Sequence, residues 1–190
     1  MKRRLSPFTQ TRTTITASLA LLCSLTATAP VLAQDHEHAN QISAARLVRD
    51  VQDATRGFLD VNNLPPGYQP LFGCVSGPDH GAMGIHYVNL ALVGDGKIDL
   101  SQPEAVIYEP VGRARRLVGV EYIVDAPTWL ADPAHEGLPP QLDGQAFQLV
   151  GIPNRFGIPS PFFELHVWAW RDNPQGAFVD WNDNVTCERQ

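Results

Sequence analysis

The sequence predicts a mainly β domain with an N-terminal helix, an α+β chain whose strands form an antiparallel sandwich or a small barrel. From about Gln41 to Leu59, apolar residues recur every three or four positions, which is the period of an amphipathic helix. Beyond Gly67, short apolar runs alternate with turn residues, which favours short antiparallel strands. The 16 prolines and 15 glycines of the chain agree with a fold that has many turns.

The residues before the helix are predicted to direct export. The chain opens with basic residues at positions 2–4, continues with an apolar run over 15–29 and reaches a small-residue cleavage pattern at 31–33. This order is typical of a secretory signal peptide, so residues 1–33 are expected to be removed and the mature chain to begin at Gln34. The sequence does not distinguish the general secretory route from twin-arginine export. It predicts a secreted or periplasmic protein.

The mature chain is predicted to be one acidic domain. Removal of residues 1–33 leaves 157 residues, of which 10 are Lys or Arg and 20 are Asp or Glu, a net charge of −10. This charge argues against nucleic acid or an anionic membrane as a partner. No second apolar stretch approaches the ~20 residues of a membrane span, so we expect no membrane association after cleavage. The oligomeric state is not predicted.

The length favours a single compact domain over residues 41–190. Residues 34–40 are polar and are expected to form a flexible N-terminus. A helix follows at 41–59 and a β-rich core at 67–187. The predicted strands lie near Ile85–Val93, Ala105–Tyr108, Leu117–Val124, Ala146–Val150 and Phe162–Trp170.

Two connections of the β-rich core are also predicted. Gly94-Asp95-Gly96 indicates a tight turn between the first two strands. Ala126–Gly144 contains four prolines and has no clear period, which indicates a long ordered loop over the sheet.

Two cysteines remain in the mature chain, Cys74 and Cys187. An isolated pair in an exported protein is expected to form a disulfide. In the chain-entropy treatment, closing so long a loop stabilises the folded state by about 4–5 kcal/mol at most. Two separate thiols or metal ligands are the alternative, although neither cysteine lies in a closely spaced ligand motif.

The main candidate site consists of ionisable residues within three predicted strands. His86, Glu121 and His166 each lie among apolar or aromatic residues of their strand. A lone buried carboxylate costs several kcal/mol, so Glu121 requires a partner. Two histidines and one carboxylate can hold Fe(II) or Zn(II) and leave positions open for water or a substrate. The sequence therefore predicts a divalent metal site, with His80 or Glu164 as a fourth ligand or a residue that supports the ligands.

A structural interpretation of the same residues remains open. Each histidine could form hydrogen bonds within the core, and Glu121 could pair with one of the nearby arginines, Arg113, Arg115 or Arg116.

Aromatic residues close to these positions suggest a ligand pocket. Tyr87, Tyr122, Trp168 and Trp170 lie beside or near the candidate ligands in the sequence. We expect them to line an apolar pocket for a small molecule. With the metal, this arrangement could make a metal-dependent enzyme. Without it, the protein could be a non-catalytic small-ligand-binding protein or a structural envelope protein.

Four segments carry a resemblance to other proteins. They are Gly84-Ile-His-Tyr-Val-Asn89, Pro103-Glu-Ala-Val-Ile-Tyr108, Val118-Gly-Val-Glu-Tyr122 and Glu164-Leu-His-Val-Trp-Ala-Trp-Arg-Asp-Asn-Pro174. With them, the chain from about Arg56 to Cys187 resembles an uncharacterised family of secreted bacterial proteins. The resemblance implies export and no particular activity. Histidine and glutamate on strands are also similar to the cupin metal pattern, but the close His-x-His pair of cupins is absent here.

Overall fold

The structure is a computed structural model that describes residues 31–77 and 80–189. Apart from its last three positions, the predicted signal peptide lies outside these residues and stays a prediction. The first described element is helix α1 (Val31–Thr55), which starts earlier than the expected helix and includes residues 34–40. Among the described residues, no helix combines the length and the apolar character that a membrane span needs.

The second half of α1 packs on the sheet through one face. Leu47 and Val51, one helical turn apart, are fully buried, and Thr55 follows one turn later with its hydroxyl bonded to the Val51 carbonyl. Two 3-10 turns continue the chain, η1 (Arg56–Leu59) and η2 (Val61–Asn63). The predicted helix over 41–59 is therefore observed as an α-helix followed by a 3-10 turn.

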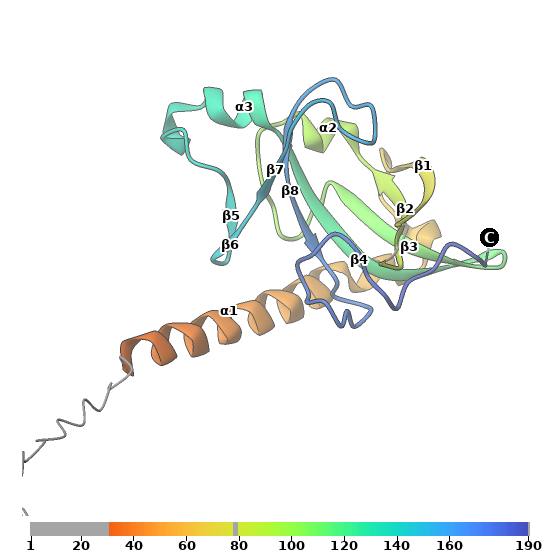
Figure 1. Cartoon of the computed structure of the whole chain (residues 1–190). Coiled ribbons are helices and arrows are strands. Elements are labelled where there is room, and N and C mark those ends of the chain that lie inside the picture. Colours follow the sequence, from red (N-terminus) through yellow and green to blue (C-terminus); the bar gives the residue numbers. More distant parts are fainter. Residues whose placement is uncertain (1–30, 78–79, 190) are drawn as a thin grey trace, which may run out of the picture. The chain divides into compact units, whose positions relative to one another are not determined.

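A six-stranded antiparallel sheet forms the body of the domain, in the order β1-β2-β3-β4-β8-β7. It curls into a half-barrel, as Figure 1 shows, and confirms the predicted mainly β, α+β fold class. Strands β5 (Gln141–Leu142) and β6 (Gln145–Ala146) form a separate hairpin. The strands of the main sheet are β1 (Gln69–Ser76), β2 (Ala82–Val88), β3 (Ala105–Val111), β4 (Ala114–Asp125), β7 (Gln148–Val150) and β8 (Phe162–Val167).

Some boundaries differ from the prediction for local reasons. The strand expected over 85–93 ends at Val88, because Asn89 caps the short helix α2 (Leu90–Val93) through a bond from the Ala91 N–H. Strand β1 was not predicted. A bulge in which Phe72 and Gly73 have positive φ angles interrupts its alternation, so the sequence shows no period of two there.

The connections also differ from the prediction. The turn expected at 94–96 is part of a longer connection that joins α2 to β3. The loop expected over 126–144 contains helix α3 (Ala126–Ala131), the turn η3 (Pro133–His135) and strand β5.

The two faces of the sheet bury different residues. The face toward α1 carries the larger apolar cluster, which includes Tyr108, Val120, Tyr122 and Leu165 together with Leu47 of the helix. The opposite face, here called the site face, carries a smaller cluster around Ile107, Val118 and Trp168. Because side chains alternate along a strand, each ligand candidate faces away from its immediate neighbours in sequence.

The C-terminal segment is held against the sheet. Cys74 and Cys187 are bonded, with their Cα atoms 5.7 Å apart, which confirms the predicted disulfide between β1 and this segment. Glu109 on β3 accepts a hydrogen bond from the Thr186 N–H, and the side chain of Val185 is buried. These contacts hold the residues after β8 over one end of the site face.

Candidate metal centre

The candidate ligands come from three strands of the site face. His86 lies on β2, Glu121 on β4 and His166 on β8. Glu121 and His166 are directly opposite each other in the β4–β8 register. His86 lies on the far side of β3, so it has to reach Glu121 across a whole strand.

The β3 residue that pairs with Glu121 is small, whereas His86 pairs with Ile107 of the same strand. Ala105 on β3 pairs with Glu121 on one side and with Val88 on the other, and it is fully buried. The Ala105 side chain is a single methyl group, so it leaves space above β3 beside the Glu121 carboxylate. The neighbouring strands curl, and the two side chains meet above β3.

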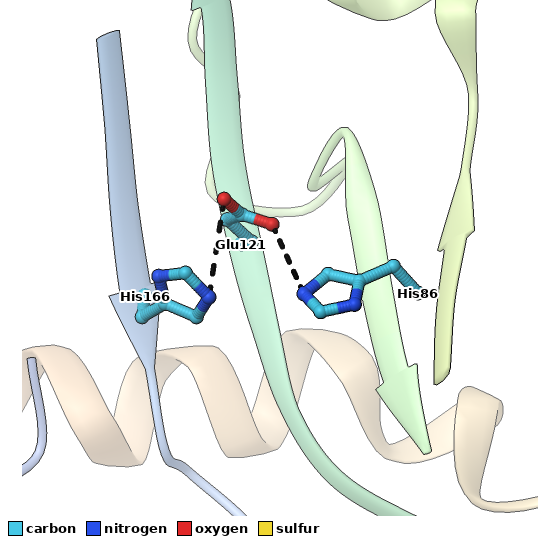
Figure 2. Close-up of side chains that lie close together, drawn as sticks. All are labelled: His86, Glu121 and His166. Carbon is cyan, nitrogen blue, oxygen red and sulfur yellow. Dashed lines mark ion pairs between the residues drawn. The ribbon is translucent and has the colours of Figure 1, made fainter. Parts of the chain in front are cut away.

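The three side chains point toward one another, as Figure 2 shows. His86 Nε2 lies 3.5 Å from Glu121 Oε2, and His166 Nε2 lies 3.9 Å from Glu121 Oε1. One ligand atom from each residue falls within 4.8 Å of the other two, close enough for one cation to contact all three. The residues are 7%, 4% and 2% exposed in sequence order, so the cluster is buried.

Protein partners leave much of this cluster unsatisfied. Within the described part of the chain, His86 Nδ1 and both ring nitrogens of His166 are buried without a hydrogen-bond partner. Each buried polar group without a hydrogen-bond partner costs about 1–3 kcal/mol of folding free energy. The orphaned nitrogens, with a carboxylate between two rings, fit the donor set of a divalent transition metal.

The structural alternative with an arginine partner is not what the structure shows. Arg116 bonds to Glu109 with two guanidinium nitrogens, near the turn that joins β3 to β4. Arg115 bonds to the Ala114 carbonyl and leaves its Nε unpaired. No ion pair between Glu121 and an arginine occurs among the described residues.

Burial sets the protonation of the cluster. It lowers the pKa of His86 to about 3, with an additional contribution from His166, and it lowers the pKa of His166 to about 4. Both rings are therefore neutral near pH 7, the state that binds metals. Burial, followed by the nearby Glu164, raises the pKa of Glu121 well above its usual value. A metal cation in place of the Glu121 proton would offset the free-energy cost of burying the ionised carboxylate.

A second group of potential ligands adjoins the first. Glu164, His166 and Asp180 also offer ligand atoms within 4.8 Å of one another, and His166 Nδ1 lies 3.9 Å from Asp180 Oδ1. The Gln148 amide donates to both carboxylates and holds them in place. The sequence did not indicate Asp180 or Gln148 as site residues, because neither lies in a recognisable ligand motif.

The two predicted additional ligands lie at different places. Glu164 is buried beside the cluster, where it shares a hydrogen bond with Glu121. His80 is exposed and lies in neither group of potential ligands. It borders a separate hollow beside Gln148 and Asp180. Geometry therefore favours Glu164 over His80 as the residue next to the cluster.

The cluster forms the floor of a cavity of about 170 Å³. Its walls come from β1, from α2 and from the 151–161 segment that joins β7 to β8. Most of the lining side chains are apolar, namely Leu71, Phe72, Met83, Val88, Leu90, Val93, Ile123, Phe156, Ile158 and Phe162. Strands β2, β4 and β8 thus carry the candidate ligands and part of the apolar lining, and β1, α2 and the 151–161 segment complete the walls.

No family model, curated protein or solved structure matches this chain. The resemblance to secreted bacterial proteins therefore stays a prediction, and the case for a function depends on the geometry of the site.

The four aromatic residues expected in the pocket are not among those that line it. Tyr87 and Tyr122 are sequence neighbours of ligand candidates, and strand alternation turns them to the α1 face, where each packs against the core. Trp168 shares the site face and stacks on His166 at 6.1 Å, but its indole bonds to the Val179 carbonyl beneath the C-terminal segment. Trp170 bonds to Thr55 of α1.

Proposed function

We propose that this protein binds one divalent transition metal ion through His86, Glu121 and His166, and that the open coordination positions face the apolar cavity. The observation that carries the proposal is the convergence of three buried ionisable groups on one point, with histidine nitrogens that no protein group satisfies. A metal would offset all of these desolvation costs at once. Zn(II) and Fe(II) are the cations that suit two imidazoles and one carboxylate.

A metal held in this way would supply Lewis acidity or lower the pKa of a bound water. The chain contributes two neutral imidazoles, a carboxylate, and walls that exclude bulk water. Glu164, hydrogen-bonded to Glu121, is placed to orient the ligating carboxylate or to hold a proton beside it. We therefore propose a metal-binding protein whose site is built to admit a small molecule and to act on it.

We also propose that the protein is exported and functions outside the cytoplasm. The support is the order of basic, apolar and small residues at the N-terminus, together with the disulfide between Cys74 and Cys187.

Elemental analysis of purified protein tests the metal site. Wild-type protein, refolded or purified with Zn(II) or Fe(II) and then dialysed, should retain about one metal ion per chain. Glu121→Gln and His166→Ala should each lower the retained metal at least tenfold, because each removes a ligand. His80→Ala serves as the matched control and should keep the full metal content.

The free energy of unfolding of the same variants provides a second measurement. Metal at 100 times its dissociation constant should stabilise the wild-type fold by about 2.7 kcal/mol, and this gain should disappear in Glu121→Gln. Wild-type protein that retains neither metal, or a Glu121→Gln variant that retains as much as wild type, would rule the proposal out.

The cavity favours a second candidate, a non-catalytic binding protein in which the histidines and Glu121 orient a small ligand by hydrogen bonds. The same experiment separates the two. A binding protein of this kind would be free of metal and yet gain thermal stability from small apolar compounds.

A further inference from the structure

We infer that the cavity above the proposed metal takes a small neutral molecule with one ring and one polar atom that reaches the metal. The inference rests on the proposed metal site and adds the class of ligand that the site admits.

The size of the cavity limits the ligand to about one ring. The cavity measures about 170 Å³. An engineered apolar cavity of about 150 Å³ in another protein holds a single benzene molecule. A peptide, a nucleotide or a sugar chain would not fit below the rim.

The walls select an apolar body. Ten of the sixteen lining residues are Leu, Ile, Val, Met or Phe, and they surround the space above the cluster. Transfer of apolar surface into such a space is favourable by roughly 25 cal/mol per Å². The polar groups are concentrated at the floor and along one side, so the polar atom of the ligand would point toward the metal.

The charges of the lining select a neutral ligand. Its ionisable residues are His86, Glu121, Asp125, Glu164 and His166, and neither Lys nor Arg is among the described residues that line it. Anion sites are normally built with arginine, lysine or several N–H groups. Arg155, on the segment between β7 and β8, lies with its guanidinium 4.5 Å from the ring of Trp181 and 5.6 Å from the ring of Phe156, and it is not one of the lining residues.

Asp125 adds a negative charge at the wall. Burial raises the pKa of Asp125, but hydrogen bonds from Ser160 and Thr128 outweigh this effect and bring the pKa below its usual value. Asp125 is therefore ionised at neutral pH. The charges of a divalent ion, of Glu121 and of Asp125 sum to zero, so a neutral ligand keeps the lining balanced, whereas an anionic ligand would add an uncompensated negative charge.

Two aromatic rings that contact each other are part of the cavity lining. Phe72 on β1 and Phe156 on the 151–161 segment have ring centroids 5.5 Å apart. Phe72 is 51% exposed and has a φ of 63°, a conformation that a bulky residue rarely adopts. Strained backbone of this kind is concentrated at binding sites. This pair suits contact with a flat ring at the rim of the cavity.

Benzamide and benzoate test the inference because they have nearly the same shape and differ in charge. The protein is loaded with Zn(II), its metal content is measured, and each compound is titrated by calorimetry at pH 7. We expect benzamide to bind at least tenfold more tightly than benzoate. Asp125→Asn should reduce the difference between the two affinities, because it removes the negative charge of this side chain and keeps its size.

Tryptophan substitutions locate the binding. Ile158→Trp and Val93→Trp fill the cavity from two different walls, and at least one folded variant of this pair should lose benzamide binding at least tenfold. Leu149→Trp is the control, because Leu149 is 60% exposed on β7 and does not line the cavity.

The outcomes separate this inference from the proposed function. A metal-loaded protein that binds benzoate as tightly as benzamide, or whose benzamide binding survives both cavity-filling substitutions, overturns the inference and leaves the metal site standing. A protein that takes up no metal overturns the metal site, and with it the inference.

Discussion

Three buried glutamates show how differently one residue type is accommodated in this domain. Glu109 pairs with Arg116 and accepts the Thr186 N–H, so its charge is balanced. Glu104 accepts a hydrogen bond from the Ile123 N–H and has no ion-pair partner among the described residues. Glu121 faces two neutral histidines and a second carboxyl group. Glu109 therefore has the partners of a structural ion pair. Glu121 instead lies between two imidazole rings, as a metal-binding carboxylate would.

Glu104 allows a test of these assignments by pH. Burial raises the pKa of Glu104 to about 8 from a usual value near 4.5. Between these values the folded state keeps a proton that the unfolded state has released, so this carboxyl group stabilises the fold fully below pH 4.5 and loses that contribution as pH rises toward 8. The free energy of unfolding of wild type, relative to Glu104→Gln, should fall by up to about 1.4 kcal/mol per pH unit in this window.

Urea unfolding of both proteins in chelator, from pH 4.5 to 8.5, measures the difference. Glu188→Gln, at an exposed position near the C-terminus, is the control and should show no such trend. A difference between wild type and Glu104→Gln that does not change with pH would contradict the assigned burial of this carboxyl group.

At the scale of the elements, the site is a property of four adjacent strands. Strands β2, β4 and β8 each carry one ligand candidate, and β3 separates β2 from β4. On β3, Ala105 pairs with Glu121 and Ile107 pairs with His86, so the two ligand candidates meet diagonally above this strand. A small side chain at position 105 leaves space beside Glu121 on the site face.

Ala105→Val tests the role of β3. The added methyl groups would crowd the space beside Glu121, across which His86 approaches, and we expect metal affinity to fall at least tenfold. Overpacking should also destabilise the metal-free fold by about 1–3 kcal/mol. Ala169→Val is the matched control, since Ala169 is equally buried but packs in the cluster on the α1 face.

Both variants should lose similar stability, and only Ala105→Val should lose metal affinity. Competition with a chromophoric chelator measures the affinity. Equal affinities in the two variants would show that Ala105 does not control the approach of the ligands.

At the scale of the whole molecule, long-range links hold the walls of the site together. The disulfide joins β1, which supplies Leu71 and Phe72 to the cavity, to the C-terminal segment that covers Trp168. Its sequence separation is 113 residues, so it constrains most of the β-rich core. The disulfide therefore links a strand of the cavity wall to the segment that covers Trp168, the residue whose ring stacks on His166.

Removal of this link should be costly. Cys74→Ala combined with Cys187→Ala should lower the free energy of unfolding by about 2–5 kcal/mol, as expected for a native disulfide that closes a long loop. Denaturant unfolding of oxidised wild type and of the double variant measures the loss. Free thiols at both positions in native exported protein would refute the bond itself.

Export is tested on the same molecule. The mass of protein recovered from the periplasm or the medium should correspond to a chain that begins at Gln34, because the cleavage pattern ends at Ala33. Replacement of Ala33 by Arg should block processing, with Ala27→Ser as the control. Recovery of a membrane-bound species that keeps residues 1–33 would contradict the prediction.

The sequence by itself determined the mainly β class, the presence of an amphipathic helix within residues 41–59, the cysteine pair and the identity of the three ligand candidates. These follow from local periods and from the chemistry of residue types, which act over a few neighbouring positions. The same alternation of side chains places Tyr87 and Tyr122 away from the site, and the prediction that they line the pocket was wrong because it followed closeness in sequence.

Only the tertiary structure decided what surrounds the cluster. Strand order and register bring His86, Glu121 and His166 together across β3, and they bring Asp125, Glu164, Asp180 and the 151–161 segment to the same place. Contacts of this kind join residues far apart in the chain, and they depend on the curl of the sheet and on the exact pairing of strands. A local pattern carries no information about either, because a shift of one residue would turn every side chain to the other face.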